Sequence, residues 1–82
     1  MLDRQQLLQR ITLQPRVLLG KPTIRGLRIS VEQILSALAA GVPEDDLLAD
    51  YPELEPADIR AALLYAAERV CEDRVYALEP TP

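Results

Sequence analysis

The chain contains no histidine, no tryptophan and no phenylalanine, and it has one cysteine among its 82 residues. Without histidine and with a lone Cys71, the usual general bases, metal-ligand sets and nucleophile dyads are not available. We therefore expect a protein that is not an enzyme and that binds no metal or cofactor. A single cysteine excludes an internal disulfide and fits a reducing compartment. The core has to come mainly from leucine, isoleucine, valine and alanine.

The sequence also lacks an apolar run long enough to span a bilayer, and its start, Met1-Leu2-Asp3, does not resemble a signal peptide. We expect a cytoplasmic protein that makes no membrane contact. Residues 1–82 form one small domain, near the lower size at which a single core is self-sufficient. This size favours a homodimer or another partner that adds buried surface.

Charge is divided unevenly along the chain, although the net charge is only −4. Residues 1–31 carry six cations and one carboxylate, whereas residues 32–82 carry three cations and twelve carboxylates. Such a division suggests two surfaces with different partners, one of them anionic. The alternative is that the carboxylates of the second half lie on solvent-facing sides of helices and bind no partner.

The densest group of cations lies between Gly20 and Val31, where it alternates with apolar residues. This pattern predicts a basic strand from Thr23 to Ile29, in which Gly26 marks a bulge, a bend or a close approach of another backbone. The strand belongs to a basic N-terminal segment with β structure, residues 1–29, which also contains a short extended piece at 11–13.

Three helices are expected after this segment, over about Ser30–Ala40, Glu44–Tyr51 and Pro56–Glu72. Ser30 and Gln33 form a capping box at the start of the first of these helices, and Gly41 ends that helix. The acids that open the second helix complement its dipole, with a metal cluster as the alternative. The sequence thus predicts a mainly α fold: a short β segment, a trihelical unit of the helix-turn-helix kind at residues 30–72, and a flexible tail at 73–82. The expected core residues are Leu35, Leu38, Leu48, Ile59 and Leu63.

One pattern of residues extends across most of the chain: Gly20-Lys21-Pro22-x-Ile24-Arg25-Gly26-x-Arg28-Ile29-x-Val31, then Ile34-Leu35, Gly41, Tyr51-Pro52 and Asp58-Ile59-x-Ala61-Ala62-Leu63-x-Tyr65-Ala66. Over residues 10–68 this pattern closely resembles the bacterial family known as domain of unknown function 433. The resemblance implies a homeodomain-like helix-turn-helix fold. It also implies an antitoxin-like protein, related to VapB-type antitoxins and often encoded beside a PIN-like toxin ribonuclease.

The chain departs from the family pattern at four positions. Leu19 stands where a second glycine is usual, Leu27 where threonine is usual, and Ser30 where proline is usual. Glu55 replaces the usual serine or threonine cap of the last helix. Leu19 and Leu27 make the basic segment more apolar, which favours protein contact over DNA contact there, and Glu55 weakens DNA binding through the last helix.

Two functions from different classes follow. The first is an antitoxin that neutralises a toxin nuclease and autoregulates its operon by binding operator DNA. The second is a protein-interaction module that does not bind DNA. If DNA is bound, phosphate contact requires cations, and the candidate DNA-binding residues are Arg16, Lys21, Arg25, Arg28 and Arg60. The alternative for Arg25 and Arg28, and to a lesser extent for Lys21, is pairing with carboxylates of the same domain.

The basic strand is also the candidate dimer interface, because one isolated strand leaves its ladder groups unpaired. The residues expected in that homodimer interface are Thr23, Ile24, Leu27 and Ile29. The contact with the toxin nuclease is placed on the acidic second half of the chain or on the tail. The tail residues expected to bind the partner are Val75, Tyr76 and Leu78.

Overall fold

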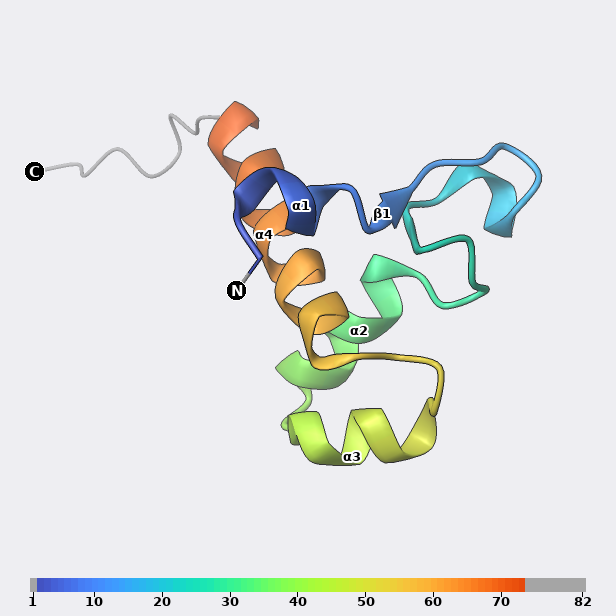
Figure 1. Cartoon of the computed structure of the whole chain (residues 1–82), viewed down its shortest axis with the longest axis vertical. Coiled ribbons are helices and arrows are strands. Elements are labelled where there is room, and N and C mark those ends of the chain that lie inside the picture. The colour runs from blue at the N-terminus through green and yellow to red at the C-terminus, as the bar shows by residue number, and fades with distance from the viewer. Residues whose placement is uncertain (1, 74–82) are drawn as a thin grey trace, which may run out of the picture.

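The computed structural model describes residues 2–73, and within this range it contains four α-helices and one two-stranded antiparallel sheet (Figure 1). The mainly helical fold with a short N-terminal β segment is therefore confirmed. No helix within residues 2–73 is long and apolar enough to cross a membrane. The elements follow in the order α1 (Arg4–Leu8), β1 (Ile11–Thr12), η1 (Leu18–Gly20), β2 (Thr23–Ile24), α2 (Val31–Ala39), α3 (Glu44–Asp50) and α4 (Pro56–Asp73).

The three helices of the predicted unit, α2, α3 and α4, lie within a residue or two of their expected bounds. The capping box of α2 is present: the Ser30 hydroxyl accepts from the Gln33 amide at 2.9 Å, and the Gln33 side chain accepts from the Ser30 amide at 2.8 Å. Gly41 follows α2 in the left-handed region with φ +93°, where glycine is favoured. Local signals within one helical turn therefore account for these ends.

The core lies where α2, α3 and α4 meet the N-terminal segment, and Ile24, Ile34 and Ile59 are completely buried in it. Of the expected core residues, Ile59 is fully buried, while Leu35, Leu38 and Leu48 are partly buried against the cluster. The expectation for Leu63 was wrong, because its side chain is 45% exposed. Helix α4 instead buries Ala61 and Ala62 beside Ile59. Small side chains on this face let neighbouring elements approach the helix closely, so periodicity centred on the larger leucine misplaced the face.

The predicted strand Thr23–Ile29 was also wrong, because the chain turns back in the middle of it. Arg25 (φ +46°) and Gly26 (φ +75°) are both left-handed, the backbone of a type I′ turn, which joins strands tightly. The Leu27 amide donates to the Ile24 carbonyl at 2.7 Å, and the Ile24 amide donates to the Ile29 carbonyl at 3.0 Å. The expected bend at Gly26 is confirmed.

The first arm of this turn is β2, and it pairs with β1 in the register Ile11 to Ile24 and Thr12 to Thr23. The other arm closes on it through a bridge between Thr23 and Ser30. The ladder groups that were expected to seek a second copy of the chain are thus used within the chain. We call β1, β2 and the turn and arm that follow β2, up to Ser30, the β module. It leads directly into α2, because Ser30 is the N-cap of that helix.

Candidate functional site

A buried carboxylate at the start of α4 gathers the β module and the N-terminal segment around it. Asp58 has no exposed surface. Its carboxylate accepts hydrogen bonds from three groups of the chain instead of from water. Arg25 donates from Nε to Oδ1 at 3.0 Å and from Nη2 to Oδ2 at 2.8 Å. Arg10 donates from Nη1 to Oδ1 at 2.8 Å, and the Glu55 amide donates to Oδ2 at 2.8 Å. We call Arg10, Arg25 and Asp58 the Asp58 cluster.

Each member of the Asp58 cluster is positioned by a local feature of the chain. Asp58 is the third residue of α4, so its carboxylate reaches back to the Glu55 amide in the manner of half a capping box. This bond satisfies the Glu55 amide, which is the half of a capping box that does not depend on a serine or threonine at position 55. Arg25 occupies the first left-handed position of the β turn, and its Nη2 also donates to the Glu53 carbonyl at 2.7 Å. One side chain therefore joins the turn to both the start of α4 and the loop before it.

The electrostatics of the cluster keep Asp58 charged. Burial by itself raises the pKa of the Asp58 carboxyl, but the hydrogen bonds from Arg25, the Glu55 amide and Arg10 outweigh it, and the pKa lies below its ordinary value. The carboxylates raise the pKa of Arg10, chiefly through Glu55, and that of Arg25, chiefly through Asp58. The cluster is therefore a permanent ion pair at neutral pH, and its role in the fold is structural.

This arrangement changes the reading of Arg25, which sequence reasoning had placed among the DNA-binding candidates. Its guanidinium is occupied by Asp58 and the Glu53 carbonyl, so it is not available to a phosphate without breaking the cluster. Arg10 was missed altogether. The signal that could have found the pair is that Arg25 and Asp58 both belong to the residue pattern that carries the family resemblance, and one is a cation and the other an acid.

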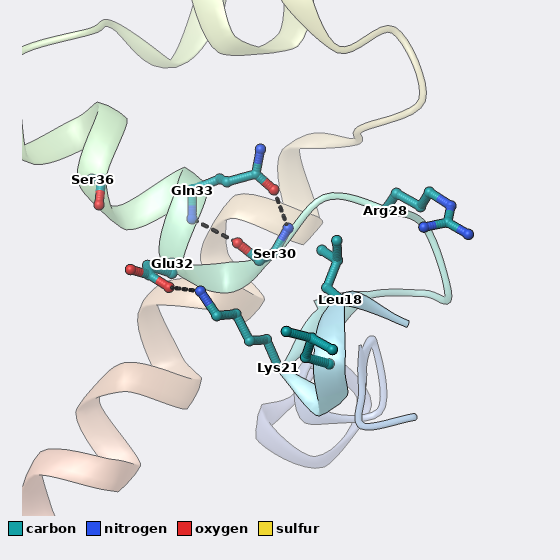
Figure 2. A pocket seen from close by; sticks show the side chains of 8 residues that line it. Leu18, Lys21, Arg28, Ser30, Glu32, Gln33 and Ser36 are labelled. Carbon is teal, nitrogen blue, oxygen red and sulfur yellow. Dashed lines mark hydrogen bonds and ion pairs between the residues drawn. The ribbon is translucent and has the colours of Figure 1, made fainter. Parts of the chain in front are cut away.

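A second feature is an open groove between the Leu18–Gly20 turn and α2, with a volume of about 570 Å³ (Figure 2). The ammonium of Lys21 lies 2.9 Å from the Glu32 carboxylate, and both side chains are more than half exposed. Arg28 also lines the groove but extends away from α2 in Figure 2. The remaining polar lining comes from Ser30, Gln33 and Ser36.

The other candidate residues are divided between surface and core. Arg16, Arg28 and Arg60 are exposed, and no ion pair joins them to a carboxylate among the side chains that the structure describes, those of residues 2–71. The alternative of internal pairing thus holds for Arg25 and for Lys21 and not, in this range, for Arg28.

The four residues expected at a dimer interface lie mainly inside the molecule. Thr23 and Ile24 have no exposed surface and Ile29 is 5% exposed, while Leu27 is half-buried against the core. Side chains that fill their own core have no surface to offer to a second copy, so the burial of these residues argues against a dimer interface built on all four. The tail residues Val75, Tyr76 and Leu78 lie outside the described residues.

An acidic surface covers α3 and the loop after it. Five carboxylates there are exposed, and no ion pair joins any of them to a cation within the described part of the chain. They are Glu44, Asp45, Asp46, Asp50 and Glu53. We call this set the α3 acidic face. It lies at the end of the molecule away from α1 and β1 (Figure 1).

Comparison with known proteins gives three matches. Residues 11–66 match the family model described as Protein of unknown function (DUF433). An uncharacterized protein y4eO of Sinorhizobium fredii (strain NBRC 101917 / NGR234) is 36% identical over 56 residues, which is 68% of this chain and a quarter, 25%, of that protein's length. The crystal structure of a DUF433 member protein from Anabaena variabilis ATCC 29413 is similar with a TM-score of 0.69 and 35% identity, covering 83% of this chain and 66% of that one.

Proposed function

The chain belongs to the family described as Protein of unknown function (DUF433), and from this premise we propose that it is an antitoxin-like protein that binds and neutralises a PIN-like toxin ribonuclease. The observation that carries the proposal is the α3 acidic face, which the chain leaves without counter-ions of its own within residues 2–73. Unpaired surface charge of one sign attracts a partner of the opposite sign and speeds its association.

A ribonuclease is a suitable partner for such a face. It binds the phosphates of RNA, so the surface around its active site has to carry cations. Carboxylates presented on a rigid helix can occupy that surface in place of RNA. Helix α3 is anchored for this role by Leu47, which is 2% exposed, while the carboxylates before and after it face solvent.

The test uses the PIN-like ribonuclease that the proposal predicts to be encoded beside the gene of this chain, and it measures inhibition of RNA cleavage. We expect the triple variant Asp45→Asn, Asp50→Asn, Glu53→Gln to inhibit more weakly, with slower association and a flatter salt dependence. Glu32→Gln, which removes one exposed carboxylate of α2 outside the face, is the control and should inhibit normally. Inhibition by the triple variant that equals the wild type at all salt concentrations would refute the proposal.

Binding of operator DNA, with autoregulation of the operon, is the second candidate function. The observation that favours it is the groove that Lys21 and Arg28 line together with Ser30, Gln33 and Ser36, because cations, hydroxyls and amides suit a phosphate backbone. Arg16 and Arg60 add exposed cations. Arg25 is left out of this proposal because Asp58 holds it.

A gel-shift assay with the DNA upstream of the gene separates the second candidate from a protein-interaction module that does not bind DNA. Binding through Lys21 and Arg28 predicts a salt-sensitive complex. Each change to alanine should lower the slope of log affinity against log salt by about one. A missing complex at low salt would leave the protein-interaction module as the function. A slope unchanged in both variants would refute phosphate contact by Lys21 and Arg28.

A further inference from the structure

Leu19 is the most exposed large apolar residue within residues 2–73, with 95% of its surface open to solvent. Its backbone is left-handed (φ +57°, ψ +35°), between Leu18 at φ +48° and Gly20 at φ +81°. Leucine in this conformation carries a strain that glycine would not. Strained, non-glycine positions that persist in a structure are concentrated at functional and ligand-contacting sites.

The turn that carries Leu19 is held in a fixed shape. The Val17 amide donates to the Gln14 carbonyl, the Gly20 amide to the Val17 carbonyl, and the Lys21 amide to the Leu18 carbonyl, all at 3.0 to 3.1 Å. The leucine is therefore presented on a pre-organised turn, an arrangement that lowers the entropic cost of inserting a side chain into a partner.

The same molecule offers a groove of matching chemistry. Between α2 and α4 lies an open apolar groove of about 360 Å³, whose apolar lining is Pro22, Val31, Leu35, Tyr65, Ala66 and Val70. One cation, Arg69, also lines it. Val70 is 58% exposed. Glu32 and Ser36 line this apolar groove and also the groove beside Leu18 and Leu19. The turn and the apolar groove therefore lie on either side of one strip of α2.

Charge indicates which partner this surface fits. The segment that carries Leu19, residues 14–28, has four cations and no carboxylate, whereas residues 31–73, which form α2 to α4, have two cations and eleven carboxylates. Summed over the two segments, the net charge of the basic segment of one copy is thus opposite to that of the helical unit of another copy. Lys21 and Arg25 are paired with Glu32 and Asp58 of their own copy, so Arg16 and Arg28 are the cations that this segment offers to a partner. In a two-fold dimer each copy supplies both surfaces, so the attraction operates twice.

We propose that the chain forms a two-fold homodimer in which Leu19 of each copy inserts into the apolar groove between α2 and α4 of the other. A two-fold axis that passes close to the Glu32–Ser36 strip places each turn over the partner's groove, because turn and groove flank that strip. The contact buries Leu19 and Val70, both left exposed by a single copy. It also brings Arg16 and Arg28 toward the helical unit of the partner, whose net charge is negative.

The first test is the molar mass of the full chain by light scattering at micromolar concentration. The wild type should be a dimer. Leu19→Gly should raise the dimer dissociation constant by about 100-fold or more, since a buried leucine is worth about tenfold to 100-fold and two are lost per dimer. At concentrations at which both proteins are monomers, the melting temperature of Leu19→Gly should be no lower than that of the wild type, because glycine relieves the backbone strain.

Two further variants complete this test. Val70→Asp, on the other side of the contact, should also give a monomer. Leu13→Ser, which removes an exposed leucine (61% exposed) outside the apolar groove, should leave the dimer intact. A monomeric wild type, or a dimer that survives both Leu19→Gly and Val70→Asp, would overturn the proposal.

A cross-link identifies the contact itself. In a Cys71→Ser background, one preparation carries Leu19→Cys and another carries Val70→Cys, and the two are mixed under mild oxidation. Disulfide geometry requires the Cα atoms to lie within about 7 Å, so a 19-to-70 bond between copies supports the proposal. Bonds formed only between two copies of the same variant would overturn it.

Discussion

Removing the charge of Asp58 is the sharpest test of how this fold is held together. In Asp58→Asn the side chain keeps its size but can no longer accept charge-assisted hydrogen bonds from Arg10 and Arg25 at both oxygens. Breaking a buried ion pair on one side typically costs about 3–5 kcal/mol. Here the Arg10 and Arg25 side chains remain 22% and 33% exposed, so water solvates part of their charge. We therefore expect a loss of about 3 kcal/mol, at the lower end.

A loss of this size can be measured because it is smaller than the stability of the domain, so the variant still folds. A domain of this length has a free energy of unfolding of about 4–12 kcal/mol. Urea unfolding followed by circular dichroism at pH 7 gives the difference between wild type and Asp58→Asn. An exposed pair provides the control: Lys21→Gln should cost less than about 1 kcal/mol, because Lys21 and Glu32 are more than half exposed.

The pH dependence of the difference tests the electrostatic origin. The pKa of Asp58 is lower in the folded state than its ordinary value of 3.8, so its charge stabilises the fold at and above neutral pH. That contribution is lost as the pH falls through the folded-state pKa. The gap between wild type and Asp58→Asn should thus be constant around pH 7 and should narrow as the pH is lowered below about 4.

A double-mutant cycle with Arg25→Gln assigns the effect to the pair. We expect a coupling free energy of at least about 1 kcal/mol between positions 25 and 58, since the two groups are in direct contact. A gap that does not change with pH, or two substitutions whose effects simply add, would refute the view that the ion pair holds the β module on α4.

Four further substitutions have expected effects on stability, each measured by thermal or urea unfolding. Ser30→Ala should cost about 1–2 kcal/mol, because it removes the hydroxyl that accepts from the Gln33 amide, and the Ser30 side chain is buried. Leu63→Ala should cost less than about 1.5 kcal/mol because Leu63 is 45% exposed, whereas Ile59→Ala should cost about 2–5 kcal/mol because Ile59 is fully buried. Leu19→Gly should leave monomer stability unchanged or raise it by about 1 kcal/mol, since a left-handed backbone favours glycine. Equal losses for Leu63→Ala and Ile59→Ala would contradict the assignment of the buried face of α4.

The helices could be predicted from the sequence because their signals are local. Ser30 and Gln33 are three residues apart, Gly41 directly follows the end of α2, and Pro56 is the first residue of α4. Each of these residues acts on backbone groups within one turn. Local signals do not determine which side of α4 is buried. Leucine at position 63 is more apolar than alanine at 62, and the choice between them depends on how closely the neighbouring elements pack.

The Asp58 cluster could not be predicted from local sequence signals as the helices could. Arg25 and Asp58 are 33 positions apart, and their contact depends on a turn in which a non-glycine residue adopts a left-handed backbone. Alternating polarity from Thr23 to Ile29 looks like a continuous strand, and only Gly26 marks the place where the chain reverses. With the turn assigned as a strand, the cations along it looked like one exposed row. Once the chain reverses, Arg25 lies against α4, while Lys21 and Arg28 remain on the groove beside α2.

Position 19 shows how a departure from a family pattern can be interpreted physically. The usual glycine there suits the left-handed backbone that the structure has at this residue. At Glu55, a second departure, the amide of this residue has an acceptor inside the chain, because it donates to the Asp58 carboxylate. At Leu19 no such compensation exists within residues 2–73, since the side chain is almost fully exposed while its backbone remains strained. A substitution that costs stability and makes no contact in its own chain has its physical reason in a contact with another molecule. The groove between α2 and α4 of a second copy supplies that contact. Leucine at position 19 thus has two effects, backbone strain in the monomer and a contact in the dimer, and Leu19→Gly separates them because it should leave monomer stability unchanged or raised while it weakens association.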